Sequence, residues 1–160
     1  MLFELLFERT PVPNLLHRPG PVDAPAPARP KNVAAAGTLL AAAVIASLVN
    51  VVIAAIGHAA GASHQFMPLN VPSFVSFTVL GILIGAAGWA IVRRRATRPR
   101  ALLRRLVPIV LGISFIPDLA MLFSSYLPHS NAAGVVSLLA MHVVVAAVAV
   151  TAYTRALPVD

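Results

Sequence analysis

Cysteine is absent from the 160-residue chain, and charged residues are scarce. The lack of cysteine excludes disulfides, thiolate metal sites and thiol redox chemistry. Charged residues make up 11% of the chain and only five residues are acidic, whereas an average soluble domain carries about 25% charged residues. So few charges cannot cover a surface that faces water, and we therefore expect an integral membrane protein.

Apolar sequence is abundant instead: 59% of the residues are hydrophobic, and the mean hydropathy is +0.87. Four apolar segments each approach the ~20 residues that a helix needs to cross ~30 Å of hydrocarbon. They predict an all-α fold, a bundle of four transmembrane helices that forms a single membrane domain of residues 32–155. The predicted spans are residues 33–56, 74–92, 106–123 and 135–153.

Residues 1–31 precede the first predicted span and contain seven prolines. Each proline fixes φ and removes a backbone donor, so we expect a disordered, proline-rich cytoplasmic tail. Glu4 and Glu8 lie four positions apart among apolar residues, which fits a short helix on a membrane surface; a start codon assigned too early fits equally well. The tail has no secretory signal pattern. Residues 156–160 are expected to form a second, short cytoplasmic tail.

Basic residues are distributed unevenly along the chain. Four lie in the N-terminal tail, one follows the last predicted span, and seven lie between the second and third spans. The two remaining connections, residues 57–73 and 124–134, contain neither lysine nor arginine. The positive-inside rule therefore predicts a multi-pass protein of the bacterial plasma membrane with both termini in the cytoplasm. The central cluster consists of Arg93, Arg94, Arg95, Arg98, Arg100, Arg104 and Arg105.

This arginine cluster has two interpretations. One is a topology anchor that also contacts anionic lipid headgroups, and the other is a nucleic-acid site. The short connection has no aromatic residues to stack on bases, so the first interpretation is favoured and no nucleic acid is expected. Trp89, Tyr126 and Tyr153 fall near predicted span ends, where aromatic rings are expected to lie at the membrane interface.

Small residues in the second span indicate where helices pack. Gly81 and Gly85 form a GxxxG pair and Gly88 follows, which makes one helix face flat enough for another helix to approach closely. The approaching helix can belong to the same chain, to a second copy in a homo-oligomer, or to another membrane protein.

Three of the spans each carry one strongly polar residue in their outer third. At a rise of ~1.5 Å per residue, Asn50, Asp118 and His142 lie roughly 8 to 11 Å below the outer ends of their spans. Thr78 lies slightly above this predicted polar layer. Ser114 lies one turn before Asp118 and lengthens the polar strip on the same helix face.

The carboxyl group of Asp118 is the costliest member of the layer, since an ionised carboxylate in hydrocarbon costs at least ~3 kcal/mol. We expect it to face the bundle interior and to bond His142, the one histidine inside a predicted span, with Asn50 beside them. Pro117 withholds an N–H from the carbonyl of Ile113 and bends the helix, which opens room for a side chain or for water.

Two functions suit this layer. In the first, its hydrogen bonds hold the helices in register at about 1 kcal/mol each, and the protein is a non-enzymatic structural or accessory membrane module. In the second, an acid and a histidine beside a broken helix form the relay of a small, oligomeric, proton-coupled transporter or permease. The first is the leading interpretation, because four spans are few for a transport path in one chain.

Nothing in the sequence predicts an enzyme or a cofactor. Nucleophile motifs, phosphate loops and paired catalytic carboxylates are all missing. His58, His64 and His129 fall in the outer connections, but their spacing matches no metal-ligand pattern, so no metal is expected. A single histidine within the predicted spans also argues against a haem held by two histidines.

The stretches "LVNVVI" in the first span, "FIPDL" in the third and "MHVVVAA" in the fourth occur together with the arginine-rich connection. In this combination the chain resembles a family of small four-span actinobacterial membrane proteins known only as a domain of unknown function. The resemblance covers residues 33–154 and leaves the proline-rich tail outside. It implies a fold and a membrane location, and it implies no activity, ligand or catalytic residue.

Overall fold

The computed structural model describes residues 31–123 and 127–159, and all regular secondary structure in these ranges is helical. The predicted proline-rich tail, apart from Lys31, lies outside the described residues. Four α-helices and one short 3₁₀ helix follow one another along the chain. They are α1 (Lys31–Ala59), η1 (Met67–Leu69), α2 (Val71–Arg95), α3 (Pro99–Ala120) and α4 (Ala132–Ala156).

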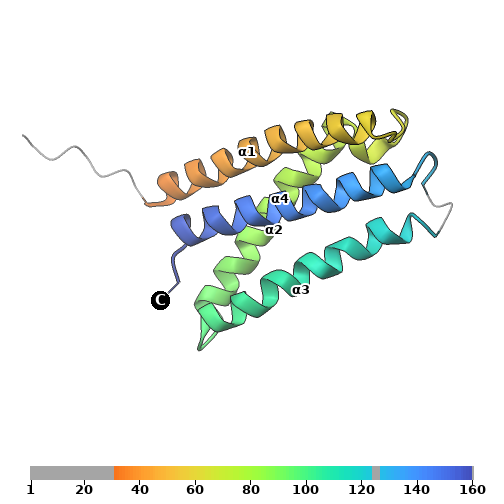
Figure 1. Ribbon diagram of the computed structural model, residues 1–160. Coiled ribbons are helices and arrows are strands. Elements are labelled where there is room, and N and C mark those ends of the chain that lie inside the picture. The colour runs from red at the N-terminus through yellow and green to blue at the C-terminus, as the bar shows by residue number, and fades with distance from the viewer. Residues whose placement is uncertain (1–30, 124–126, 160) are drawn as a thin grey trace, which may run out of the picture.

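Consecutive α-helices run in opposite directions, so the chain passes along the bundle four times (Figure 1). The beginning of α1, the connection between α2 and α3, and the end of α4 lie together at one end, which we call the arginine end. The connection between α1 and α2 and the beginning of α4 lie at the opposite end. Helix α4 packs against all three other α-helices and most extensively against α1.

Local sequence signals set the helix ends. Helices α2 and α3 both carry proline in the first turn, where a missing N–H has no helical partner in any case. Helix α4 begins after Asn131, whose Oδ1 accepts a hydrogen bond from the N–H of Gly134 at 2.9 Å. Three arginines occupy the last turn of α2, where positive charge is favourable next to the helix dipole.

Helix α3 ends earlier than its predicted span. The α-helix stops at Ala120 instead of Phe123, and residues 121–123 continue the chain through three tighter i→i+3 hydrogen bonds. Such 3₁₀ bonds are common in the last turn of a helix. They follow directly on Pro117, which has no N–H to offer the preceding turn and so weakens the regular ladder.

Three described helices are long and apolar enough to cross a membrane: residues 33–59 of α1, all of α2 and all of α4. Helix α3 does not reach the same hydropathy. Three arginines, Arg100, Arg104 and Arg105, lie in its first two turns, and the mainly apolar residues 106–120 include Asp118. Three of the four predicted spans are therefore confirmed as helices long and apolar enough to cross a membrane.

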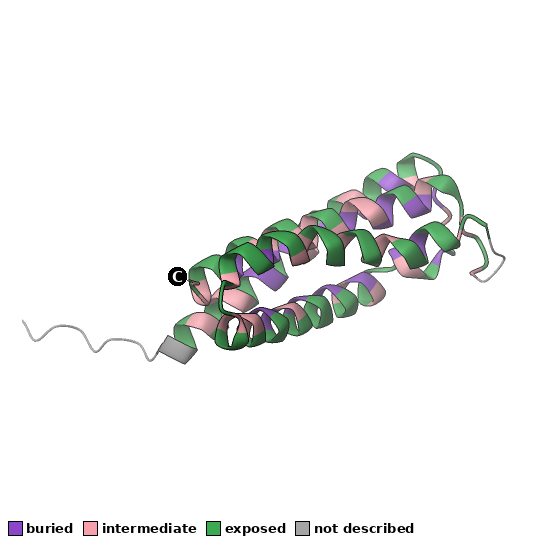
Figure 2. Ribbon diagram, turned by 90° about the horizontal axis from the view of Figure 1, so that it is seen from below, coloured by how far each residue is buried: buried purple, intermediate pink, exposed green. Residues whose placement is uncertain are grey.

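Small residues fill the interior of the bundle, and large apolar residues cover its surface. Figure 2 shows buried residues on the faces where helices meet and exposed residues on the outer faces. Ala46 is 0% exposed, whereas Leu40 is 68% and Phe77 is 71% exposed. Lipid tails are as apolar as these outer side chains, so the helices associate through close packing of alanine and glycine. This distribution suits a bundle surrounded by hydrocarbon.

The buried apolar residues form two clusters, one toward each end of the bundle. Trp89 and Tyr153 belong to the cluster at the arginine end, and Phe66 belongs to the cluster at the opposite end. Along α1, Asn50 lies midway between Ala46 of one cluster and Ala54 of the other. Along α2, Thr78 lies midway between Phe74 and Ile82 in the same way. Both polar side chains therefore separate two apolar cores.

Candidate functional site

An acidic residue of α3 and a histidine of α4 meet inside the bundle. Nδ1 of His142 lies 3.1 Å from Oδ2 of Asp118, the distance of an ion pair. The Asp118 side chain is only 7% exposed, whereas the His142 side chain is 38% exposed. The carboxyl group is thus enclosed between helices, and the imidazole reaches the outer surface of the bundle.

The imidazole has two acceptors close to the same nitrogen. Nδ1 of His142 also lies 2.9 Å from the carbonyl oxygen of Leu138, one turn earlier in α4. A protonated Nδ1 carries one hydrogen, so it cannot donate fully to both acceptors. Oδ2 of Asp118 consequently has no well-formed hydrogen bond among the described residues, although it is buried. The contact with His142 is therefore electrostatic and close, with one carboxylate oxygen left short of a donor.

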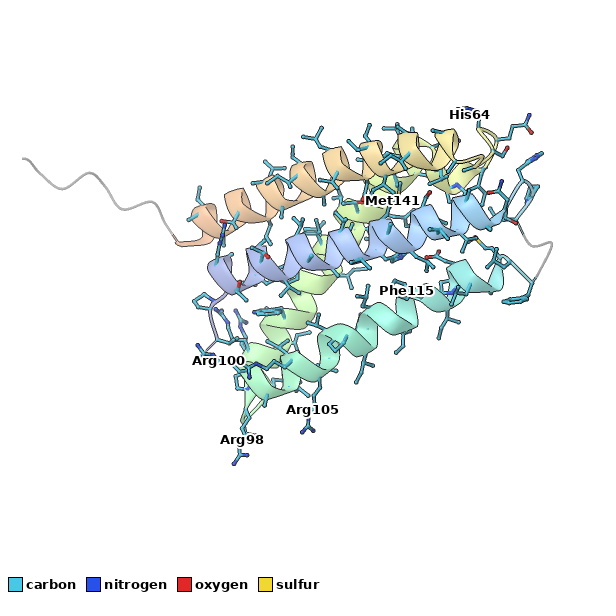
Figure 3. All side chains as sticks on the ribbon, viewed as in Figure 1. His64, Arg98, Arg100, Arg105, Phe115 and Met141 are labelled. Atoms are coloured by element: carbon cyan, nitrogen blue, oxygen red, sulfur yellow. The ribbon has the colours of Figure 1, made fainter. Side chains whose placement is uncertain are left out.

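An aromatic ring and a proline shape the surroundings of this pair. The ring of Phe115, labelled on α3 in Figure 3, stands edge-on to the imidazole of His142, with ring centroids 6.2 Å apart. Pro117 precedes Asp118 and leaves the turn without one backbone donor. The hydroxyl of Ser114 donates to the carbonyl of Leu111 at 2.6 Å, so its hydrogen is used within α3 and not on Asp118.

A second polar pair joins α1 to α2. Nδ2 of Asn50 donates to Oγ1 of Thr78 at 3.1 Å, and the two side chains belong to residues that are 1% and 4% exposed. Oδ1 of Asn50 is buried and has no hydrogen-bond partner among the described residues. Thr78, predicted to lie slightly above the polar layer, is thus the residue that Asn50 contacts.

Three of the four paired residues lie at similar depths within their helices, whereas Asp118 lies two residues before the end of α3. Asn50 is nine residues before the end of α1, Thr78 is seven residues into α2, and His142 is ten residues into α4. These positions are roughly 10 to 15 Å from the opposite end of each helix. They are deeper than predicted because the helices extend beyond the predicted spans. No hydrogen bond or ion pair joins one pair to the other in the described part of the chain, so a continuous polar layer stays a prediction.

The three glycines of α2 differ in what they face. A Cβ on Gly85 would lie 2.5 Å from the hydroxyl of Tyr153, so this glycine is in close contact with α4. Gly81 and Gly88 have nothing within 4 Å of such a Cβ. The flat strip predicted from all three therefore packs within the chain only at Gly85.

The sequence analysis did not single out the close approach between α1 and α4 at Gly57. A Cβ on Gly57 of α1 would lie within 3 Å of Oγ of Ser137 on α4. Gly57 and Gly61 form a second GxxxG pair, but Gly61 lies beyond the end of α1 at Ala59, so only the partner helix reveals the role of Gly57. Close approach to a specific neighbour, not a motif within one helix, is what requires glycine there.

Trp89 and Tyr153 lie near the ends of α2 and α4, and their rings face the bundle interior. They are 6% and 4% exposed, and their rings lie 5.5 Å apart inside the bundle. Their polar atoms find acceptors there: Nε1 of Trp89 donates to the carbonyl of Leu157 at 2.9 Å, and the Tyr153 hydroxyl donates to the carbonyl of Ile82 at 2.5 Å. Buried rings of this kind are stable only with such acceptors. Tyr126 lies outside the described residues.

The seven clustered arginines all lie at or near the arginine end, where Figure 3 labels Arg98, Arg100 and Arg105. Arg93 is half-buried and the other six are exposed. Asp118 is the single acidic residue in the described part of the chain. It lies in the half of α3 away from the arginine end, where it contacts His142. Within the described residues the arginines thus have no carboxylate partner. Any anion that pairs with them does not belong to these residues.

Two histidines stack at the opposite end. The rings of His58 and His64 lie 4.2 Å apart at an interplanar angle of 17°, and Nδ1 of His58 lies 3.1 Å from the carbonyl of Ala62. Among the described residues, no three His, Cys, Asp or Glu side chains are placed to hold a metal ion. His129 adopts a left-handed φ of 64° and takes no part in the stack.

A family model matches residues 29–159, nearly the whole helical part of the chain. The chain belongs to this family, described as "Family of unknown function (DUF6069)". The resemblance to an uncharacterised family is thus confirmed, and the match extends a few residues beyond the predicted range on both sides. No curated protein and no solved structure matches the chain.

Proposed function

We propose that this family member is a four-span, multi-pass module of the bacterial plasma membrane with both termini in the cytoplasm. Its role is structural or accessory, without catalysis. Helices α1, α2 and α4 are apolar enough to cross the membrane by themselves.

Helix α3 completes the set of four spans. It lies against α2 and α4 and runs from the arginine end toward the opposite end. Its arginines occupy only the first two turns, where long side chains can reach the lipid headgroups. The contact between Asp118 and His142 ties its far half to a helix that is itself a membrane candidate. These observations favour insertion of α3 together with its neighbours.

The distribution of basic residues supports the proposed orientation of the bundle in the membrane. The arginine end carries the seven clustered arginines, and Arg155 lies in the last turn of α4 at the same end. Neither lysine nor arginine occurs in the connections at the opposite end. The positive-inside rule places the arginine end in the cytoplasm.

The observation that carries the structural role is that the buried polar contacts each join two different helices. Asn50 and Thr78 join α1 to α2, Asp118 and His142 join α3 to α4, and the Tyr153 hydroxyl joins α4 to the backbone of α2. In a membrane, contacts of this kind hold helices in register, at an average of about 0.6 kcal/mol each. Every helix takes part in at least one of them.

A proton-flux measurement tests this role. The purified chain is reconstituted in vesicles that contain a pH-sensitive dye, and an imposed pH gradient is followed over time. A structural module leaves the gradient as long-lived as in protein-free vesicles. Collapse of the gradient in wild type, with recovery in Asp118→Asn and not in the control Thr151→Val, would contradict it. Thr151 suits the control because it is exposed and bonds only the carbonyl of Ala147 in its own helix.

A second candidate function is proton-coupled transport with Asp118 and His142 as the relay. One specific observation favours it: the buried Oδ2 of Asp118 lacks a well-formed hydrogen bond, while the His142 side chain is 38% exposed. A relay needs a path for protons, and the exposed side of His142 lies on the outer surface of the bundle, where a second copy of the chain would have to line that path. Four spans give one chain little room for a path, so this function requires a homo-oligomer. Crosslinking in the membrane that yields only monomers would exclude it.

A further inference from the structure

A cavity of about 450 Å³ opens at the arginine end, between α2, α3, α4 and the last described residues of the chain. Its volume lies within the usual range of small-molecule sites, roughly 300 to 1,000 Å³. The wall has two parts of different chemistry. Arg100, Arg104 and Thr154 contribute polar groups to the wall, and Trp89, Val107, Pro108 and Val150 are among its apolar residues.

The two parts follow one another along a single face of α3. Arg100 and Arg104 are one turn apart, and Val107 and Pro108 continue the same face one turn deeper. From Arg100 to Pro108 the rise is about 12 Å. A ligand that lies along this face meets positive charge first and apolar side chains afterwards.

The residues after α4 help to hold the arginine in place. Nε of Arg100 donates to the carbonyl of Val159 at 2.9 Å, and Nε1 of Trp89 donates to the carbonyl of Leu157 at 2.9 Å. Because Nε of Arg100 is fixed in this way, its two terminal nitrogens remain as donors. Neither Arg100 nor Arg104 has a carboxylate partner among the described residues.

We propose that this cavity binds one anionic phospholipid of the cytoplasmic leaflet. Its phosphate lies between Arg100 and Arg104, because guanidinium groups bind phosphate oxygens through paired hydrogen bonds. Its acyl chain lies along Val107, Pro108 and Val150. The proposal rests on the membrane location proposed above, which puts the arginine end at the level of the headgroups. Charge complementarity selects the anionic class, and the apolar wall selects a lipid over a free phosphate.

A neighbouring hollow provides a matched control. It lies at the connection between α2 and α3, and Arg95, Arg98 and Arg105 contribute to it. No residue of α4 and no residue after α4 lines this hollow, whereas both contribute to the wall of the cavity. The double variant Arg98→Ala/Arg105→Ala removes the same charge as Arg100→Ala/Arg104→Ala, but from outside the cavity.

Trp89 is the only tryptophan of the chain and lines the cavity, so its fluorescence reports on the occupant. The full-length chain is reconstituted in vesicles of phosphatidylcholine. Lipids with brominated acyl chains, either phosphatidylglycerol or phosphatidylcholine, are then added at increasing mole fraction. Wild type and the control variant are expected to be half-quenched by brominated phosphatidylglycerol at an about tenfold lower mole fraction than by brominated phosphatidylcholine. Arg100→Ala/Arg104→Ala is expected to lose this preference.

Three results would overturn the proposal. Equal quenching by the two lipids in wild type excludes a specific anionic lipid. Equal loss of preference in both double variants assigns the effect to surface charge in general. A change of Trp89 emission with inorganic phosphate alone, dependent on Arg100 and Arg104 and without lipid preference, assigns the site to free phosphate. If the alanine variant loses helicity by circular dichroism, Arg100→Gln/Arg104→Gln replaces it.

The same experiment gives a different result if the arginine end does not lie at the membrane. In that case aqueous iodide quenches Trp89 and neither brominated lipid does, whichever variant is used. The two proposals are therefore distinguished within the same experiment.

Discussion

Nδ1 of His142 lies 3.1 Å from Oδ2 of Asp118, and this is the ion pair that joins α3 to α4 in the described part of the chain. The carboxylate is buried and the imidazole is half-exposed. Since α3 is the least apolar of the four helices, this contact is the main polar tie that holds its far half in the bundle.

A double-mutant cycle measures that tie. We expect Asp118→Ala and His142→Ala to show a coupling energy of about 1 kcal/mol, within the range of 0.5 to 1.7 kcal/mol typical of interhelical polar contacts in membranes. The measurement is the free energy of unfolding in mixed micelles on addition of a denaturing detergent. The control cycle pairs Asp118→Ala with Asn50→Ala, which should be additive because no hydrogen bond joins those two residues. Coupling of equal size in both cycles would instead indicate one connected network.

Thr78→Val is expected to destabilise the bundle by about 1 kcal/mol, because the near-isosteric valine leaves the buried Nδ2 of Asn50 without its acceptor. The double variant Asn50→Leu/Thr78→Val should recover part of this loss, since no buried polar group then remains. Ser76→Ala is the control, because the Ser76 hydroxyl is exposed and bonds its own helix at Pro72. Detergent unfolding measures all three. Equal unfolding of Thr78→Val and wild type would show that the bond contributes nothing to stability.

Gly57→Ala is expected to destabilise the bundle by roughly 1 to 3 kcal/mol, the usual cost of overpacking. The added methyl group would overlap Oγ of Ser137, and relief requires this hydroxyl to leave its hydrogen bond to the carbonyl of Ala133 or α1 and α4 to move apart. Gly81→Ala is the matched control on α2, where a Cβ meets nothing within 4 Å, and it should be neutral or slightly stabilising. Thermal unfolding in detergent compares them. The account is wrong about this crossing if Gly81→Ala is the more damaging of the two.

Tyr153→Phe is expected to cost about 0.5 to 1.5 kcal/mol, because it removes the hydrogen bond to the carbonyl of Ile82 and leaves the ring in place. Thermal unfolding followed by circular dichroism measures the change. Thr154→Val serves as the control, since the Thr154 hydroxyl is exposed and bonds the carbonyl of Thr151 in its own helix. An aromatic residue that only contacted lipid headgroups would tolerate Tyr153→Phe as well as that control.

The helices themselves could be predicted from the sequence, because length and hydropathy are properties of one segment at a time. The predicted spans fall within helices that extend a few residues further at most ends. The exception is the end of α3, which Pro117 and the tighter turn after Ala120 bring forward. Helix α3 also shows the limit of hydropathy, because its arginines lower the average of a helix that still packs with the others.

Contacts between helices were harder to predict, because they depend on rotations that no single segment encodes. Depth alone suggested that Asn50 lies beside Asp118 and His142, whereas rotation of α1 turns its amide toward Thr78. The same difficulty affected the glycines: Gly81 and Gly88 were predicted to pack but have nothing near them, whereas Gly57, which was not singled out, meets Ser137.

The proposed four-span topology is tested most directly by cysteine labelling in intact bacteria, which the absence of native cysteine makes clean. Thr97→Cys lies exposed just before α3, and Pro128→Cys lies exposed between α3 and α4. With a membrane-impermeant maleimide, we predict labelling of Pro128→Cys in intact cells and of Thr97→Cys only after permeabilisation. Labelling of both positions from the same side would show that α3 does not cross the membrane, and the reversed pattern would show that the arginine end faces outward.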